Sequence, residues 1–350
     1  MESLLVNVVI DSHIPYIKGV LEPYVRSVRY LEPSSIDAGV MRDTHCLITR
    51  TRTRVDAALM DGSPCRFVAT ATIGSDHIDL EYCRQHGITV VNAPGCNAPA
   101  VAQYVLSSIL ALANRPLSQY TVGIVGVGHV GRIVERWARA LSMKVMTCDP
   151  VRAAAGDAGH WVTMDEIAER ADVVTFHTPL TREGDAPTFH LCDERYVGKL
   201  RRAPILINAA RGGVIDTAAV VAGLCRHQIR AAVIDTWEGE PNIDPALLRA
   251  AAIATPHIAG YSCEGKARAT AMVLDAVSRH FGLPKIVPAG APAIPADDLR
   301  LGAAPRLSDI RRGMIRLYED DAALRQAPET FEALRSSYTL RPEPIVALTN

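Results

Sequence analysis

The 350-residue sequence has few aromatic residues, almost no net charge and no closely paired cysteines. Phe, Trp and Tyr make up 5% of the chain, too few for the stacking platforms that bind single-stranded nucleic acid. Its 37 basic and 38 acidic residues leave a net charge of −1, which provides no general field to attract nucleic acid or an acidic membrane. We therefore expect neither partner, and a local basic cluster would have to hold any small anionic ligand.

None of the eight scattered cysteines lies in a C-x-x-C pair, so the sequence predicts no zinc or other metal site. Scattered thiols in a chain of this length are typical of a reduced, cytoplasmic protein. The N-terminus lacks a basic region before its apolar run, which Asp11 interrupts, so no signal peptide is predicted. The uncharged stretch 88–114 contains Pro94 and Pro99, and it predicts a buried helix over 100–113 that is too short for a membrane span.

The length exceeds what one hydrophobic core supports, so we expect at least two domains. Short β-branched runs alternate with helical patterns, which is typical of βαβ units and parallel sheets. The expected strands of the first domain are 5–10, 46–49, 67–70 and 88–92, with helices over 15–21, 55–60 and 79–86. Those of the second are 122–125, 144–148, 172–176, 205–208, 232–235 and 251–254, with helices over 131–141 and 217–224. A long helix over 265–281 would return the chain to the first domain.

The C-terminal region changes in composition. Residues 283–305 hold five prolines and six alanines, which is typical of an extended linker. A charged helix is predicted over 307–324, with apolar positions Ile310, Met314, Ile315 and Leu317, and a short amphipathic piece follows around 331–334. About 45 residues bury little core alone, so we expect this segment to pack on another surface, such as a second copy of the chain.

Residues 121–131 read TVGIVGVGHVG and place Gly126-x-Gly128-x-x-Gly131 between an expected strand and a helix. The first glycine permits a tight turn, the second lets the backbone approach a pyrophosphate, and the third allows close helix–strand packing. Asp149 ends the next strand 18 residues later, where a carboxylate would bind a ribose 2′-hydroxyl and favour NAD over NADP. The alternative is an ordinary glycine turn followed by a helix-capping aspartate.

Three polar residues follow three late strands of the second domain, at the edge where open α/β sheets bind ligands. They are Arg211 in NAARGGVID, Glu240 in DTWEGEP and His257 in TPHIAGYS. Oxidation of a hydroxy acid needs a base for the hydroxyl proton, and histidine suits neutral pH. A nearby carboxylate would stabilise the imidazolium, and an arginine fork would bind the substrate carboxylate. Each residue alone has an ordinary structural explanation, so their joint placement carries the prediction.

The motifs GIVGVGHVG, NAARGGVID, DTWEGEP and TPHIAG together resemble those of the D-isomer-specific 2-hydroxyacid dehydrogenases. The resemblance implies that Arg211, Glu240 and His257 form the catalytic triad and that NAD is the cofactor. It implies two doubly wound parallel-sheet domains: a flavodoxin-like substrate domain over 1–99 and 265–284, and a Rossmann NAD domain over 100–264. The implied cofactor-binding residues are Gly126, Gly128, His129, Val130, Gly131, Asp149, Thr178, Ala210, Asp235 and Gly260.

A narrower resemblance, to the erythronate-4-phosphate dehydrogenase family, rests on APGCNAPAVAQYV, TFHTPLTREG, HIAGYSCEGKARAT and IRRGMIRLYEDDAALR. It implies NAD-dependent oxidation of 4-phospho-D-erythronate to 2-oxo-3-hydroxy-4-phosphobutanoate, a step toward pyridoxal 5′-phosphate. It also implies a homodimer, with residues 285–350 as linker and dimerisation domain. Two alternatives stay open: another D-2-hydroxyacid dehydrogenase, such as a D-3-phosphoglycerate dehydrogenase, and a non-enzymatic NAD-sensing binding protein.

A phosphorylated hydroxy acid would need a local basic cluster, and Arg50, Arg52 and Arg54 form the densest one in the first domain. If the strand over 46–49 continued, alternation would place these arginines on one side of it. The alternative is a solvated charged loop. With the positions implied by the narrower resemblance, the expected substrate-binding residues are Arg50, Thr51, Thr72 and Tyr261. Lys266 and Arg268, on the following helix, are expected to assist.

Overall fold

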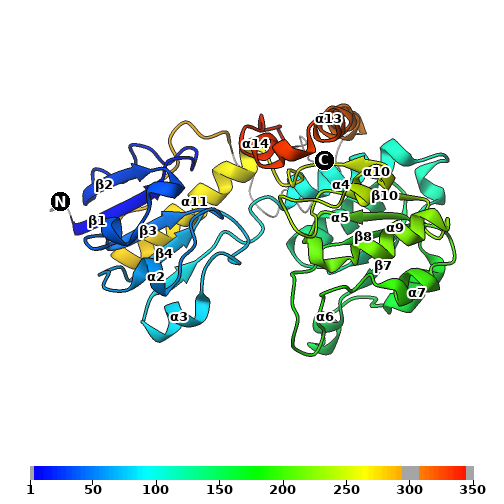
Figure 1. Ribbon diagram of the computed structural model, residues 1–350, viewed down its shortest axis with the longest axis horizontal. Helices are drawn as coiled ribbons and strands as arrows, with labels where there is room; N and C mark the ends of the chain where they lie inside the picture. The colour runs from blue at the N-terminus through cyan, green and yellow to red at the C-terminus, as the bar shows by residue number, and fades with distance from the viewer. Residues whose placement is uncertain (1–3, 294–306, 344–350) are drawn as a thin grey trace. The chain divides into compact units, whose positions relative to one another are not determined.

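The structure, a computed structural model, describes residues 4–293 and 307–343 and divides the chain into two compact units. Unit 1 comprises Met1–Asn97 and Ser262–Ile294, and unit 2 comprises Ala98–Tyr261 and Pro295–Asn350. Each unit contains one parallel sheet with helices packed on it (Figure 1). The prediction of two parallel-sheet α/β domains is therefore confirmed.

Unit 1 is built on a five-stranded sheet in the order β2-β1-β3-β4-β5, the strand order of flavodoxin-like folds. Its strands are β1 (Leu4–Asp11), β2 (Val25–Leu31), β3 (Cys46–Thr49), β4 (Phe67–Thr70) and β5 (Thr89–Val91). Its helices are η1 (Pro33–Ser35), α1 (Ala38–Met41), α2 (Ala57–Met60), α3 (Leu80–Gln85) and α11 (Cys263–Phe281). Ile48 packs with Val273 of α11, whereas its neighbour Leu47 packs with Leu59 of α2, so helices cover both faces of the sheet.

Two parts of unit 1 differ from the sequence-based expectation. Residues 15–21 form turns and no helix, because Tyr16 and Gly19 have φ values of 63° and 84°, which an α-helix excludes. Ile17 and Leu21 are nevertheless buried, so the apolar spacing that suggested a helix belongs to a loop folded against the core. Strand β2 was not expected from the sequence. It is an edge strand that pairs only with β1 in the described sheet, and only its first residue is buried. Its sequence therefore shows only a weak apolar pattern.

Unit 2 is built on a six-stranded sheet in the order β11-β10-β9-β8-β6-β7. An isolated parallel bridge between Thr147 of β7 and Trp161 extends this sheet toward the 3-2-1-4-5-6 order of a Rossmann fold. The strands are β6 (Thr121–Val125), β7 (Lys144–Cys148), β8 (Val173–Phe176), β9 (Ile205–Asn208), β10 (Ala231–Ile234) and β11 (Ile253–Ala254). The helices before the tail are α4 (Ala98–Leu112), η2 (Leu117–Gln119), α5 (His129–Ala140), α6 (Pro150–Ala154), α7 (Met164–Arg170), α8 (Glu194–Lys199), η3 (Gly212–Val214), α9 (Thr217–Cys225) and α10 (Pro245–Ala250).

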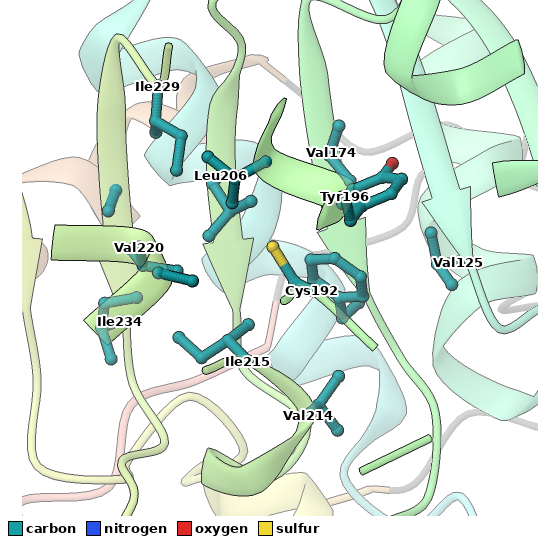
Figure 2. Packing of buried hydrophobic residues seen from close by; sticks show 14 of the residues in the cluster. Val125, Val174, Cys192, Tyr196, Leu206, Val214, Ile215, Val220, Ile229 and Ile234 are labelled. Carbon is teal, nitrogen blue, oxygen red and sulfur yellow. The ribbon is translucent and has the colours of Figure 1, made fainter. Parts of the chain in front are cut away.

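Two apolar clusters pack the faces of the unit 2 sheet. In one, Leu206 and Ile234 from the strands pack with Tyr196 of α8 and Val220 of α9 (Figure 2). The other joins the opposite strand faces to α4 and α5. Full burial of one such side chain stabilises a fold by about 1.5–3 kcal/mol. The two-sided core therefore gives a rigid support to the loops at the carboxyl edge of the sheet.

The C-terminal segment packs on unit 2 through α13 (Leu307–Gln326), η4 (Pro328–Thr330) and α14 (Phe331–Ser336). Ile310 and Leu317 are buried in the α4 cluster, and Leu324 and Phe331 are buried in the opposite one. The same chain thus covers Ile310 and Leu317, the two described positions of the apolar stripe that suggested a partner. Most of the expected linker over 283–305 lies outside the described residues, because the structure does not describe 294–306. The side chains of Met314 and Ile315 are also outside the described part. In the described ranges, no helix is both long and apolar enough to cross a membrane.

Candidate active site

The glycine-rich turn between β6 and α5 is tightly packed at the carboxyl edge of the unit 2 sheet. Gly126 has a φ of 86°, and a Cβ there would lie 2.8 Å from the carbonyl carbon of His177. A Cβ on Gly131 would lie 2.1 Å from the carbonyl oxygen of Gly126. By contrast, a Cβ on Gly128 would meet no atom within 4 Å. Packing therefore requires glycine at 126 and 131, while position 128 borders open space at the start of α5.

The N-terminus of α5 and the carboxylate of Asp149 flank this turn. Helix α5 begins at His129, and its N-cap residue Gly128 provides no side-chain cap for the first N–H groups. Such groups attract phosphate. Asp149 follows β7 and accepts the N–H of Val127 at 2.8 Å and the N–H of Arg152 at 3.1 Å. It therefore caps α6, as the alternative interpretation expected, and also holds the glycine turn.

The remaining residues predicted to bind the cofactor lie at the start of α5 or follow successive strands of the same sheet. Val130 lies in the first turn of α5, Thr178 follows β8, Ala210 follows β9, Asp235 follows β10, and Gly260 follows β11. The buried hydroxyl of Thr178 has no hydrogen-bond partner in the described part of the chain. Leaving a buried polar group unpaired costs about 1–3 kcal/mol, so this hydroxyl suits a ligand-binding position. The glycine turn, the uncapped helix and this hydroxyl all fit a dinucleotide.

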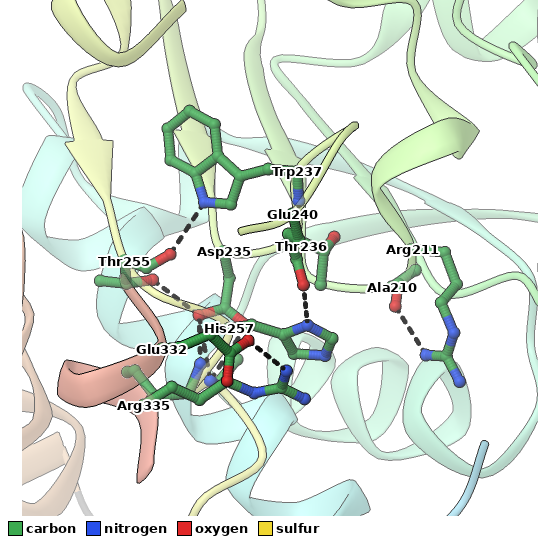
Figure 3. Close-up of polar contacts among 12 residues, drawn as sticks. Ala210, Arg211, Asp235, Thr236, Trp237, Glu240, Thr255, His257, Glu332 and Arg335 are labelled. Carbon is green, nitrogen blue, oxygen red and sulfur yellow. Dashed lines mark hydrogen bonds and ion pairs between the residues drawn. The ribbon is translucent and has the colours of Figure 1, made fainter. Parts of the chain in front are cut away.

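His257 and Glu240 form a direct pair, with 2.8 Å between Nδ1 of His257 and Oε2 of Glu240 (Figure 3). The other carboxylate oxygen accepts the N–H of Trp237 at 2.7 Å, which fixes the orientation of Glu240. Because Glu240 can only accept when ionised, neutral His257 carries its proton on Nδ1. The Nε2 lone pair is then available to take a proton from a substrate.

The pKa of Glu240 reflects two opposing effects. Burial is the largest single effect and raises the pKa of this carboxyl group, while the hydrogen bond and the charge of His257 lower it. The N–H of Trp237 and the positive charge of Arg335 lower the pKa further, so it lies below its ordinary value. Glu240 is therefore ionised at neutral pH and stabilises positive charge on His257.

Asp235 holds the backbone of His257 in an unusual conformation. His257 has a φ of 56°, in the left-handed region that residues other than glycine rarely adopt. Its N–H donates to the carbonyl of Asp235 at 2.8 Å, and the Asp235 carboxylate accepts the N–H of Ile258 at 2.8 Å and that of Ala259 at 3.0 Å. Burial raises the pKa of Asp235, while the charge of His257 and these donors oppose the rise. Such backbone strain, of order 1–3 kcal/mol, persists only where surrounding contacts impose it.

Arg211 lies on the loop next to the one that carries Glu240. Its Nη1 donates to the Ala210 carbonyl at 2.8 Å, and its own carbonyl accepts the side-chain amide of Asn208 at 3.0 Å. A Cβ on the following Gly212 would lie 1.9 Å from the Trp237 carbonyl oxygen, so the two loops are in direct backbone contact. Arg211, Glu240 and His257 therefore follow the three adjacent strands β9, β10 and β11 of one sheet.

In unit 1, the three arginines do not share one strand face, because β3 ends at Thr49 and turns follow. Arg50 pairs with the fully buried carboxylate of Asp11, with 3.1 Å between Nε and Oδ2. Arg54 instead pairs with Asp56 at 2.7 Å, and its side chain is 84% exposed. The expected arginine row is therefore wrong, and Arg50 is the arginine that the structure places directly at the strand end.

The other predicted substrate-binding residues lie in different surroundings. Thr51 is exposed in the turn after Arg50. Thr72 follows β4, the neighbour of β3, and its hydroxyl lies 2.7 Å from that of Thr70. Tyr261 belongs to unit 2, where its hydroxyl accepts Nε of Arg335 at 3.2 Å. Arg268 is buried in unit 1 and donates to the Cys96 carbonyl.

Sequence reasoning missed Asp11 and Arg335. Asp11 carried a signal, since a charged residue at the end of an apolar strand is unusual unless it has a partner. Arg335 carried none, because its proximity to Tyr261 arises from the packing of α14 on unit 2. Among the described residues, no group of three or more His, Cys, Asp or Glu side chains is arranged to hold a metal ion.

Comparison with known proteins identifies the class of protein first. The family model of the D-isomer specific 2-hydroxyacid dehydrogenase, NAD binding domain, matches residues 103–259. The solved structure of a D-lactate dehydrogenase from Aquifex aeolicus, complexed with NAD and lactic acid, has a TM-score of 0.68 at 23% identity. The aligned region covers 79% of this chain and 96% of that dehydrogenase. The TT0316 protein of Thermus thermophilus has a TM-score of 0.67 at 25% identity, covering 80% and 99%. The fold is that of the D-isomer-specific 2-hydroxyacid dehydrogenases, a class of oxidoreductases.

Curated relatives narrow this class. The erythronate-4-phosphate dehydrogenase of Bacteroides thetaiotaomicron is 41% identical over 346 residues, which cover 96% of this chain and 97% of the relative. That of Salmonella arizonae is 41% identical over 355 residues, covering 96% and 92%. The chain therefore belongs to the erythronate-4-phosphate dehydrogenase family, and the resemblance seen in its motifs is confirmed.

Proposed function

We propose that the protein oxidises 4-phospho-D-erythronate to 2-oxo-3-hydroxy-4-phosphobutanoate with NAD+, a step in the biosynthesis of pyridoxal 5′-phosphate. The observation that carries this proposal is the 2.8 Å pair of His257 and Glu240, on loops adjacent to that of Arg211. Its setting in a chain 41% identical to erythronate-4-phosphate dehydrogenases over 96% of its length favours this substrate over other hydroxy acids.

The residues that would hold NAD are those of the glycine turn and the neighbouring strand ends: Gly126, Gly128, His129, Val130, Gly131, Asp149, Thr178, Ala210, Asp235 and Gly260. When bound, this cofactor supplies the acceptor for the hydride that leaves C2 of the substrate. Nε2 of His257 takes the proton of the C2 hydroxyl as the carbonyl forms. Glu240 stabilises the resulting imidazolium, and Arg211 binds the substrate carboxylate through its guanidinium.

Arg50 is the residue that we assign to the phosphate group, with Thr51, Thr72 and Tyr261 as further substrate contacts. The buried Asp11 carboxylate accepts Nε of Arg50 and orients its guanidinium. The side chain of Arg50 remains 22% exposed, so part of it is accessible to a ligand. Arg54 is less suitable, because its ion pair with Asp56 lies on a largely exposed side chain.

The direct test is NADH formation by the purified full-length protein with 4-phosphoerythronate, erythronate and 3-phosphoglycerate as separate substrates. A charge-assisted contact contributes about 1.5–3 kcal/mol, so kcat/KM for 4-phosphoerythronate should exceed that for erythronate by roughly 10–150-fold. Preferred turnover of 3-phosphoglycerate would assign the protein to the alternative dehydrogenase. NAD binding without turnover of any of the three would favour the NAD-sensing alternative.

The proposal includes a cytoplasmic homodimer. All eight cysteines are free thiols, as is usual in a reducing compartment. The tail is the expected interface, and Tyr318 of α13 presents a large aromatic side chain that is 50% exposed. Sedimentation at micromolar concentration should show a dimer, and Tyr318→Glu should weaken it, whereas Val151→Glu, at a 65% exposed site on α6, should not. A monomeric wild type would refute the dimer.

A further inference from the structure

The C-terminal segment reaches the loop that carries His257 through Arg341. This residue follows α14, is 8% exposed, and donates hydrogen bonds from its guanidinium to four backbone carbonyls. The acceptors are Ile258 at 2.9 Å, Tyr261 at 3.2 Å, Ala100 at 3.1 Å, and Ala259. Three of them belong to the loop directly after His257, and the fourth belongs to the first turn of α4. A buried arginine therefore ties the active-site loop to the first helix of unit 2.

Two oppositely charged side chains hold this loop: one binds its backbone N–H groups and the other binds its backbone carbonyls. The Asp235 carboxylate accepts the N–H groups of Ile258 and Ala259, and the Arg341 guanidinium donates to the carbonyls of the same two residues. Hydrogen bonds to ionised groups are stronger than those between neutral groups. The backbone after His257 is therefore fixed by a carboxylate from β10 and by a guanidinium from the tail, which lies 82 residues further along the chain than Ala259.

A second tail residue contacts the same loop. The rings of Tyr261 and Tyr338 meet edge to face, with 6.0 Å between their centroids. The hydroxyl of Tyr338 donates to Asp320 of α13 at 3.0 Å, which anchors this ring within the tail. Arg341 thus acts within a tail surface that follows the loop from residue 258 to residue 261.

We propose that Arg341 is a positioning residue for His257, so that the C-terminal segment takes part in catalysis and not only in assembly. The left-handed backbone of His257 is strained and persists only if its neighbours are held by surrounding contacts. Asp235 binds the N–H groups of Ile258 and Ala259, and Arg341 supplies the opposing restraint on their carbonyls. Without Arg341, the loop can relax and move Nε2 of His257 away from the substrate hydroxyl. The catalytic consequence rests on the dehydrogenase activity proposed above.

The test compares Arg341→Gln and Arg341→Lys with a matched tail variant, Arg325→Gln, in the full-length protein. Arg325 is also a partly buried tail arginine that donates to backbone carbonyls, but its acceptors Leu248 and Ala251 lie at α10. Arg341→Gln should lower kcat by roughly 10–100-fold, the range expected when a catalytic group is slightly misplaced, with the KM for NAD little changed. Arg341→Lys should recover part of this loss, because an ammonium still donates to carbonyls. Arg325→Gln should lose thermal stability while keeping kcat.

Hydrogen exchange provides a readout that needs no activity. In Arg341→Gln, amides in the peptide 255–262 should exchange roughly 10–100-fold faster, while those of β6 should not change. A kcat no lower than that of Arg325→Gln, or unchanged exchange in this peptide, would overturn the proposal. If the wild type shows no dehydrogenase activity, the proposed function fails, and the exchange result alone decides the role of Arg341.

Discussion

At the scale of single residues, the proposed chemistry depends on Nε2 of His257, because Nδ1 is occupied by Glu240. Replacing His257 with Asn keeps a polar side chain that can still donate to Glu240, and it removes the imidazole base. We expect kcat to fall by roughly 10²–10⁴-fold, with the affinity for NAD little changed. Steady-state kinetics and titration of the protein with NAD measure the two quantities separately. Turnover near that of the wild type would remove His257 from the mechanism.

The carboxylate of Glu240 should control the pH dependence of the reaction. Burial raises the pKa of Glu240, but its hydrogen bonds and the nearby positive charges lower it overall, so Glu240 is ionised at neutral pH. In Glu240→Gln the protonated imidazole loses this partner, and deprotonation becomes easier. Oxidation requires the neutral base, so the acidic limb of the kcat/KM profile should move to lower pH. A limb that stays in place would mean that Glu240 does not stabilise the imidazolium.

Sequence alone could identify the site residues whose position in the fold follows from the residues next to them in the chain. Arg211, Glu240 and His257 each follow a short apolar strand, and parallel strands bring such ends to one edge. Arg341 gave no such signal, because its four acceptors are at least 80 residues away in sequence. The role of Asp235 in holding the backbone of His257 was also hidden, since the left-handed φ is a property of the folded loop.

At the scale of elements, Asp149 is hydrogen-bonded to the glycine turn, and substitutions at Asp149 test whether it selects NAD over NADP. Asp149 both caps α6 and presents a carboxylate beside the turn. Asp149→Asn keeps a good N-cap but removes the charge, so it should weaken NAD binding and relax the rejection of NADP at little cost in stability. Asp149→Ala should in addition lose about 1 kcal/mol of unfolding free energy. Equal use of both cofactors by the wild type would contradict the ribose assignment.

The loop after β3 can be tested for phosphate recognition. Arg50→Ala should lower kcat/KM for 4-phosphoerythronate by roughly 10–150-fold, because one charge-assisted contact is lost. Activity with unphosphorylated erythronate should change much less. Arg54→Ala is the matched control, since this exposed arginine is paired with Asp56. Equal losses with both substrates in Arg50→Ala would point instead to misfolding around the buried Asp11.

Strands were more predictable than loops and edges for a physical reason. The central strands are buried on both faces and read as short β-branched runs, as β3 and β9 show. The edge strand β2 has charged and half-buried residues, so its pattern resembles a loop. Residues 15–21 mimic a helix because Ile17 and Leu21 are four apart, yet the positive φ of Tyr16 and Gly19 breaks any helix there.

At the scale of the whole molecule, the tail is both a packing element of unit 2 and a neighbour of the active-site loop. Its buried anchors Ile310, Leu317, Leu324 and Phe331 join both core clusters. Full burial of one such side chain stabilises a fold by about 1.5–3 kcal/mol, so the four together amount to roughly 6–12 kcal/mol. This is comparable to the total stability of a typical domain, about 5–15 kcal/mol.

Two truncations should therefore behave differently. Deleting residues 307–350 removes all four anchors and exposes their apolar footprint, so we expect an insoluble or largely unfolded chain. Deleting residues 337–350 keeps α13 and α14 but removes Arg341, so this chain should remain folded and bind NAD while its kcat falls. Circular dichroism, thermal unfolding and steady-state kinetics distinguish these outcomes. Full activity in the shorter truncation would show that residues beyond α14 do not contribute to the active site. A folded, soluble protein after the longer deletion would mean that unit 2 is stable without the tail.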